Sequence, residues 1–189
     1  MKVRQPKSAL LMIDVLNDFL FPESEKLLRY AHPAAKRLAT LRRRLKPMGI
    51  PVIYVNDNFG HWQSDFKEQI ARCTSPECPG HEVASLLLPE GDDYFVLKPK
   101  HSGFYATSLE VLLGYLGVRE LILTGFAGDI CVLYTANDAH MRDYGLTIVS
   151  DCVASESESA NRIALEQMKT RLNARVVKSS SLIRPGARL

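Results

Sequence analysis

Short apolar runs alternate with amphipathic segments along the whole chain. Six runs have the length and composition of buried strands, and they lie at residues 8–14, 51–55, 94–97, 120–124, 146–149 and 174–177. Between them, apolar residues recur at helical spacing, at about 30–46, 67–72, 107–116, 129–143 and 157–172. Strands that alternate with helices at this spacing are typical of a parallel sheet with helices on both faces. The pattern therefore predicts one α/β domain.

Two local signals set the expected helix ends. Pro47 and Gly49 end the first helix, because neither residue continues helical backbone well. Thr107 is followed three residues later by Glu110, the spacing of a capping box in which each side chain satisfies a backbone N–H of the first turn. This pair predicts a helix that begins at Thr107.

Length and composition narrow the class of protein. The chain has 189 residues, 46% of them apolar and 24% charged, which fits a single soluble domain over 1–189 with its core at about 8–178. The net charge of +3 is small, and the basic run Arg42–Arg44 lies in a helical pattern, so we expect no nucleic-acid partner. No apolar stretch approaches the ~20 residues that span a bilayer. The N-terminal residues lack the features of a signal peptide, which favours a cytoplasmic location.

Three polar residues stand at or just after predicted strands. Asp14 closes the first strand, Lys98 follows the third, and Cys131 lies just past the fourth, at the start of a helix. Taken alone, each has an ordinary explanation: a turn residue, a solvated charge and a buried thiol. Ligands of open parallel sheets bind at the carboxyl ends of the strands, and this topology brings all three residues to that edge.

These residue types suit nucleophilic catalysis by a thiol. A helix N-terminus and a nearby ammonium both lower the pKa of a thiol, which predicts an activated Cys131. A carboxylate beside the sulfur can accept its proton and return it to the leaving group, which is the role we expect for Asp14. Lys98 would hold that carboxylate ionised. The loop 125–128 can direct backbone N–H groups at a developing oxyanion.

The chain resembles the isochorismatase-like cysteine hydrolases, a family that includes nicotinamidases, from about Ala9 to Val177. Four segments carry the resemblance, and the catalytic lysine of the family stands four residues before a serine, which selects Lys98 over Lys100. The segments are Leu10–Phe19 with Asp14 and Asn17-Asp18-Phe19, Leu97–Phe104 with Lys98 and Ser102, Leu123–Val132 with Cys131, and Asp138–Cys152.

The resemblance implies a three-layer α/β/α fold with a mostly parallel six-stranded sheet. It implies an Asp-Lys-Cys triad on Asp14, Lys98 and Cys131, with the backbone N–H groups of Ala127 and Cys131 as the oxyanion hole. It also implies a cis peptide between Phe126 and Ala127. A homo-oligomer, either a dimer or a tetramer, is expected from the same family.

Two small departures from the family pattern lie beside the triad. Gly128 stands where the family usually has Thr, and Gly103 where it usually has Ala.

A larger departure concerns metal binding. Nicotinamidases hold a divalent ion with an Asp-x-His pair and a later His in a Pro-x-His context. Asp57 and His81 match two of these ligands, but Phe59 stands where the first His would be, and His61 lies at a different spacing. Loss of one of three protein ligands sharply weakens a site, so we expect no bound metal and no cofactor. Cys73, Cys78 and His81 form only a weak zinc-knuckle pattern.

Three aromatic residues near strand ends are candidates for binding a small substrate: Phe19, Trp62 and Phe104. The leading hypothesis is hydrolysis of a C–N bond in a small amide through a thioester on Cys131. Three alternatives stay open. They are isochorismatase-type vinyl-ether hydrolysis, which needs the Asp and Lys but not the thiol, a non-catalytic binding protein on the same fold, and a thiol redox sensor.

Overall fold

Six parallel strands form the centre of the protein. In this computed structural model, which describes residues 8–58, 60 and 65–183, the strands lie in the order β3-β2-β1-β4-β5-β6. Their bounds are β1 Ser8–Ile13, β2 Val52–Asp57, β3 Tyr94–Lys98, β4 Glu120–Phe126, β5 Gly145–Ala154 and β6 Arg175–Val177. Every pairing is parallel, and every residue of β1 is buried, as expected for a strand covered on both faces.

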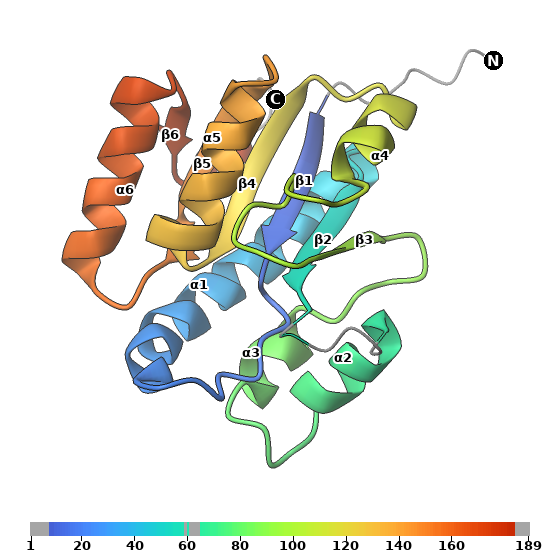
Figure 1. Ribbon diagram of the computed structural model, residues 1–189, viewed down its shortest axis with the longest axis vertical. Helices are drawn as coiled ribbons and strands as arrows, with labels where there is room; N and C mark the ends of the chain where they lie inside the picture. The colour runs from blue at the N-terminus through green and yellow to red at the C-terminus, as the bar shows by residue number, and fades with distance from the viewer. Residues whose placement is uncertain (1–7, 59, 61–64, 184–189) are drawn as a thin grey trace.

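Helices cover both faces of this sheet, so the fold has three layers (Figure 1). The helices are α1 Ser24–Leu45, α2 Phe66–Cys73, α3 His81–Leu86, α4 Leu109–Tyr115, α5 Leu133–His140, α6 Glu158–Arg171 and α7 Ser179–Leu182, with single turns η1 Lys46–Met48 and η2 Gly128–Val132. The strand pleat sends alternate side chains to opposite faces. Leu10 and Met12 pack in the core under α1, whereas Leu11 and Ile13 pack in the core under α4, α5 and α6.

Helix α1 begins six residues earlier than the sequence pattern predicts. It starts at Ser24 and contains Pro33 near its middle. Proline lacks the backbone N–H that helical hydrogen bonding needs, so a proline in the sequence argues against helix on its N-terminal side. Buried Leu27 and Ala31 extend the apolar stripe against the sheet, and this burial favours helix on both sides of the proline.

The predicted capping box at Thr107 is wrong. Helix α4 begins at Leu109, and its N-cap residue, Ser108, makes no side-chain capping hydrogen bond. The Thr107 hydroxyl accepts the Leu109 N–H at 3.2 Å, but the Glu110 carboxylate accepts a hydrogen bond from Arg142 at 2.9 Å. The ion pair therefore draws the glutamate away from the helix end.

The carboxyl edge of the sheet carries the elements that sequence reasoning described least well. Figure 1 shows α2 and α3 beyond the ends of β1 and β2; α3 and α7 were not expected from the pattern. The single helix expected over 129–143 is a π-helical turn, η2, followed by the separate helix α5. No helix within the described part of the chain is long and apolar enough to cross a membrane.

Candidate active site

The strand order brings Asp14, Lys98 and Cys131 together at the carboxyl edge. Asp14 directly follows the central strand β1, and Cys131 lies in η2, just beyond the neighbouring strand β4. Lys98 ends β3, two strands from β1. Strands lie about 4.8 Å apart, so the long side chain of lysine can reach across the end of β2. The sheet thus places a carboxylate, an ammonium and a thiol at one point.

Lys98 is the centre of this cluster. Its Nζ lies 2.8 Å from Asp14 Oδ2, 3.4 Å from Asp57 Oδ2 and 3.6 Å from Cys131 Sγ. The lysine is fully buried, and the side chain of Asp14 is 6% exposed. The backbone N–H of Asp57 donates to Asp14 Oδ1 at 2.6 Å. Both oxygens of the Asp14 carboxylate therefore have partners that hold its orientation.

Burial sets the proton distribution of the cluster. It raises the pKa of Asp14 above its usual 3.8, although Lys98 and the hydrogen bonds oppose the shift. Burial also raises the pKa of the Cys131 thiol, and the Asp14 carboxylate raises it further, against the opposing charge of Lys98. Burial lowers the pKa of Lys98, but the charges of its acidic neighbours prevail and its net pKa is raised.

The expectation of a low pKa for Cys131 is therefore wrong. The Lys98 ammonium does not outweigh the cost of a buried thiolate next to a carboxylate. The raised pKa favours the protonated thiol beside the Asp14 carboxylate.

The turn that carries Cys131 is closely packed. The peptide bond between Phe126 and Ala127 is cis, at the position that the resemblance implies. The carbonyl of Ala127 accepts the N–H groups of Ile130 at 3.2 Å and Val132 at 3.1 Å. Gly128 is hemmed in by β5 and α6: a Cβ there would lie 2.5 Å from Asn161 Oδ1. The glycine thus leaves room for the side chains that support the turn.

The predicted aromatic residues lie in different places. Phe19 is 2% exposed and packs in the core on the α1 side, with its ring 6.3 Å from that of Phe21. Trp62 lies outside the described residues, as do Phe59 and His61.

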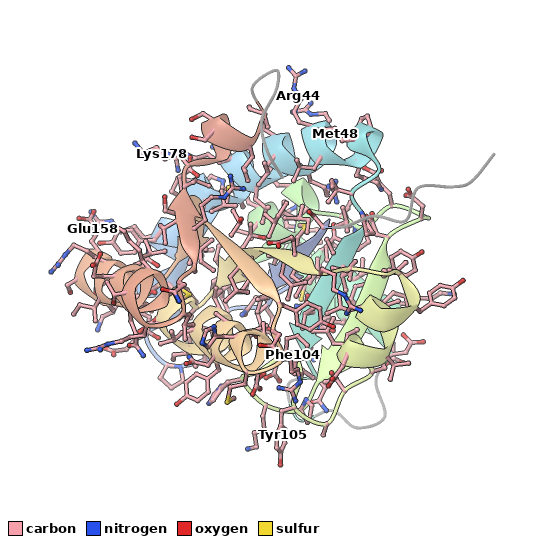
Figure 2. All side chains as sticks on the ribbon, turned by 90° about the horizontal axis from the view of Figure 1, so that it is seen from above. Arg44, Met48, Phe104, Tyr105, Glu158 and Lys178 are labelled. Atoms are coloured by element: carbon pink, nitrogen blue, oxygen red, sulfur yellow. The ribbon has the colours of Figure 1, made fainter. Side chains whose placement is uncertain are left out.

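Phe104 is buried in the core under α4, α5 and α6. Its ring lies 5.9 Å from the ring of Tyr144 and 4.9 Å from the Arg142 guanidinium. The neighbouring Tyr105 is at the surface (Figure 2). A role of Phe19, Trp62 or Phe104 in substrate binding stays a prediction.

The two residues that match metal ligands have protein partners. Asp57 Oδ2 faces the Lys98 ammonium, and His81 Nδ1 lies 2.7 Å from the carbonyl of Thr74. Among the described residues, no group of three or more His, Cys, Asp or Glu side chains is arranged to hold a metal ion. As the structure describes them, Asp57 and His81 do not form a site for a divalent ion.

The four cysteines are free thiols and differ in their surroundings. Burial raises the pKa of Cys73 to about 12, and Cys152 is also buried. Cys78 Sγ lies 3.5 Å from the carbonyl of Asp18. Cys131 alone among them has a lysine and a carboxylate beside its sulfur in the described structure.

Sequence reasoning missed the second carboxylate beside Lys98. The sequence indicates Asp57 only as a match to a metal ligand, yet it pairs with Lys98 in the register of β2 and β3. Adjacent positions on parallel strands predict this proximity once the register is known. Sequence reasoning also missed Thr135, which lies one helical turn after Cys131 and whose hydroxyl donates to the Cys131 carbonyl at 2.7 Å.

Comparison with known proteins defines the family. The family model of the isochorismatase domain matches residues 8–181. The chain belongs to the isochorismatase family. The isochorismatase family protein YaaI of Bacillus subtilis is 41% identical over 175 residues, which cover 93% of this chain and 96% of YaaI. The fold and the family together make this chain a hydrolase.

Solved structures of the isochorismatase family have the same fold. An isochorismatase-like hydrolase from Alkaliphilus metalliredigens has a TM-score of 0.74 and 26% identity, with 94% of this chain and 98% of that chain covered. The N-carbamoylsarcosine amidase of Thermoplasma acidophilum has a TM-score of 0.63 and 31% identity, with 92% and 97% covered.

Proposed function

We propose that this hydrolase cleaves a C–N bond of a small amide through a thioester on Cys131. The observation that carries the proposal is the position of the Lys98 ammonium, 2.8 Å from Asp14 Oδ2 and 3.6 Å from Cys131 Sγ. The similarity to an amidase of Thermoplasma acidophilum supports the same reaction type. Acyl transfer needs a nucleophile beside a group that can accept its proton and give it to the leaving group, and here Asp14 lies next to Cys131 for that purpose.

The first half of the reaction forms the thioester. Asp14 accepts the thiol proton while Cys131 Sγ attacks the amide carbonyl carbon, and the C=O electrons move to oxygen. We propose that the N–H groups of Ala127 and Cys131 donate to this oxyanion. Asp14 then gives its proton to the leaving nitrogen, the C–N bond breaks, and an amine or ammonia departs.

The second half releases the acid. Asp14 accepts a proton from a water molecule as that water attacks the thioester carbonyl. Collapse of the second tetrahedral intermediate breaks the C–S bond, and the proton returns to the sulfur. The sum is amide plus water giving carboxylic acid plus amine, with no other reactant. Throughout, the charge of Lys98 stabilises the Asp14 carboxylate between proton transfers.

Vinyl-ether hydrolysis is a second candidate, favoured by one observation. Burial raises the pKa of Asp14, and a carboxyl that holds a proton more firmly can protonate the double bond of an enol ether. This chemistry uses Asp14 and Lys98 and does not require the thiol. A non-catalytic binding protein would also keep the cluster, but would show no turnover.

Product assays with a cysteine variant separate these candidates. We would incubate the protein with nicotinamide, N-carbamoylsarcosine, short aliphatic amides and isochorismate, and measure ammonia and pyruvate. The amidase proposal predicts ammonia from at least one amide and loss of that activity in Cys131→Ala. The matched control is Cys78→Ala, a free thiol outside the cluster, which keeps the activity. Pyruvate release that survives Cys131→Ala would instead support vinyl-ether hydrolysis.

We also propose that the chain forms a homo-oligomer. Several large apolar side chains on the α4–α5 side are more than half exposed, among them Val111, Tyr115 and Met141, and a second copy would bury such a surface. Light scattering after size-exclusion chromatography tests this directly. A mass equal to that of one chain at micromolar concentration contradicts the proposal.

A further inference from the structure

The segment that follows Lys98 is joined to the helix that follows Cys131. The backbone N–H of Gly103 donates to Thr135 Oγ1 at 3.0 Å. The same hydroxyl donates to the carbonyl of Cys131 at 2.7 Å. Thr135 is fully buried, so neither bond exchanges freely with water. One hydroxyl thus connects residues 99–104, here called the lysine segment, to the backbone of Cys131 through two hydrogen bonds.

A second contact lies one turn further along α5. Ser102 Oγ donates a hydrogen bond to the Asp138 carboxylate, and the same oxygen accepts the N–H of Phe104 at 3.2 Å. Arg142 lies 3.4 Å from the other oxygen of Asp138. Residues three apart on a helix lie on the same side, so Thr135 and Asp138 face the lysine segment together.

Gly103 allows the lysine segment to come this close. A Cβ on Gly103 would lie 2.7 Å from Val55 Cγ1 and 3.2 Å from Leu109 Cδ2. A side chain there would push the segment away from β2 and α4. The glycine therefore keeps the Gly103 N–H within reach of Thr135.

We propose that Thr135 is a positioning residue, which holds Cys131 at the correct distance from Lys98 by bonding to both chain segments. The inference rests on the proposed function, because it gives Thr135 a role in the attack by Cys131. Lys98 ends a strand of the sheet, whereas Cys131 lies in a π-helical turn beside it. The hydroxyl of Thr135 both accepts and donates, and valine, which has the same shape, does neither.

Three variants of Thr135 separate its hydroxyl from its packing. Thr135→Ser keeps both hydrogen bonds and loses a methyl group, Thr135→Val keeps the shape and loses both bonds, and Thr135→Ala loses both. The matched control is Thr170→Val. Thr170 Oγ1 also donates to the carbonyl four residues earlier, at 2.8 Å, but at an exposed position of α6. Thermal unfolding of each variant shows whether it folds.

Two readouts are needed, and one does not depend on the substrate. The first is kcat and KM for the amide that the panel identifies. The second is the rate at which iodoacetamide alkylates Cys131 at pH 8.5, followed by peptide mass spectrometry. Lys98 favours the thiolate and Asp14 opposes it, so a sulfur displaced from these two residues is ionised to a different extent and reacts at a different rate.

We expect Thr135→Val and Thr135→Ala to lower kcat by about 10- to 100-fold, the scale of a misplaced reacting group, with KM nearly unchanged. Both should change the alkylation rate of Cys131 by about threefold or more in either direction, the equivalent of roughly half a pKa unit. Thr135→Ser and Thr170→Val should stay within about twofold of the parent in both readouts, well below the effect of a misplaced group.

Several results would overturn the inference. Normal kcat and normal alkylation in Thr135→Val would show that the hydroxyl does not position the sulfur. An equal loss in Thr135→Ser would assign the effect to the methyl group, and failure of both Val and Ala variants to fold would make the role purely structural. If Cys131→Ala keeps its activity, the proposed function fails, but the alkylation rates still decide whether Thr135 positions the thiol.

Discussion

Lys98 Nζ lies 2.8 Å from Asp14 Oδ2, and both side chains are almost completely shielded from solvent. A buried carboxylate without a counter-charge takes up a proton, because its desolvation is costly. The ammonium of Lys98 opposes this effect at Asp14. In the proposed mechanism, this pair is what allows Asp14 to act as a base at neutral pH.

Replacement of Lys98 by methionine should remove this support. Asp14 would then hold its proton more firmly and could not accept one from Cys131. We expect kcat/KM at pH 7 to fall by at least about 100-fold, the scale of general-base catalysis. The acid limb of the pH–rate profile should also move to higher pH. Steady-state kinetics across pH 4–10, with the unfolding temperature as a check on folding, measure both effects. A fall in rate with no displacement of the acid limb would contradict this role of Lys98.

The wild-type pH profile follows from the directions of the pKa shifts. The proposed reaction starts from an Asp14–Cys131 pair that has lost one of its two dissociable protons. Activity therefore rises with pH through the pKa of Asp14. Burial raises that pKa above 3.8, which places the acid limb above its value for a free aspartate. The pKa of Lys98 is raised above 10.5, so no loss is expected below that pH. An activity that rises only near the pKa of a free thiol, about 8.5, would show that Asp14 is not the base.

Removal of divalent ions should leave the enzyme active. Asp57 faces Lys98 at 3.4 Å, and no cluster of three potential ligands occurs among the residues that the structure describes. Dialysis against a chelator should change kcat by less than about twofold, whereas loss of a catalytic metal removes activity altogether. Metal analysis of the purified protein gives the independent check. If a chelator removes the activity and zinc or iron restores it, this prediction is wrong and Asp57 and His81 are metal ligands.

Gly80 should be among the positions where a methyl group does most harm. A Cβ there would lie 1.9 Å from the backbone oxygen of Asn17 and 2.8 Å from Phe19 Cδ2. Since a backbone atom cannot swing aside, Gly80→Ala should cost about 1–3 kcal/mol in the free energy of unfolding. Gly114→Ala is the control: nothing lies within 4 Å of that Cβ, and alanine inside α4 should stabilise by about 0.5–1 kcal/mol. Urea denaturation measures both. Equal stabilities for the two variants would contradict the close packing at Gly80.

The sequence predicts the strands and the Asp14–Lys98–Cys131 cluster because both depend on simple rules. Buried parallel strands are continuous apolar runs, and their carboxyl ends meet at one edge. The pKa of Cys131 could not be predicted in this way, since it depends on how much water the folded chain excludes from the sulfur. The proximity of Asp57 to Lys98 depends on strand register, which the sequence does not state. Glu110 could not be assigned either, because Arg142, its partner, lies 32 residues away.

The thioester on Cys131 is the central claim, and trapping it is the most direct test. We would add hydroxylamine during turnover of an active amide, and measure both the hydroxamate formed and the mass of the acid-quenched protein. A thioester intermediate predicts hydroxamate in proportion to hydroxylamine, and an acyl mass on the peptide that contains Cys131. Continued release of the free acid, with no hydroxamate, no acyl mass and full activity in Cys131→Ala, would contradict the account.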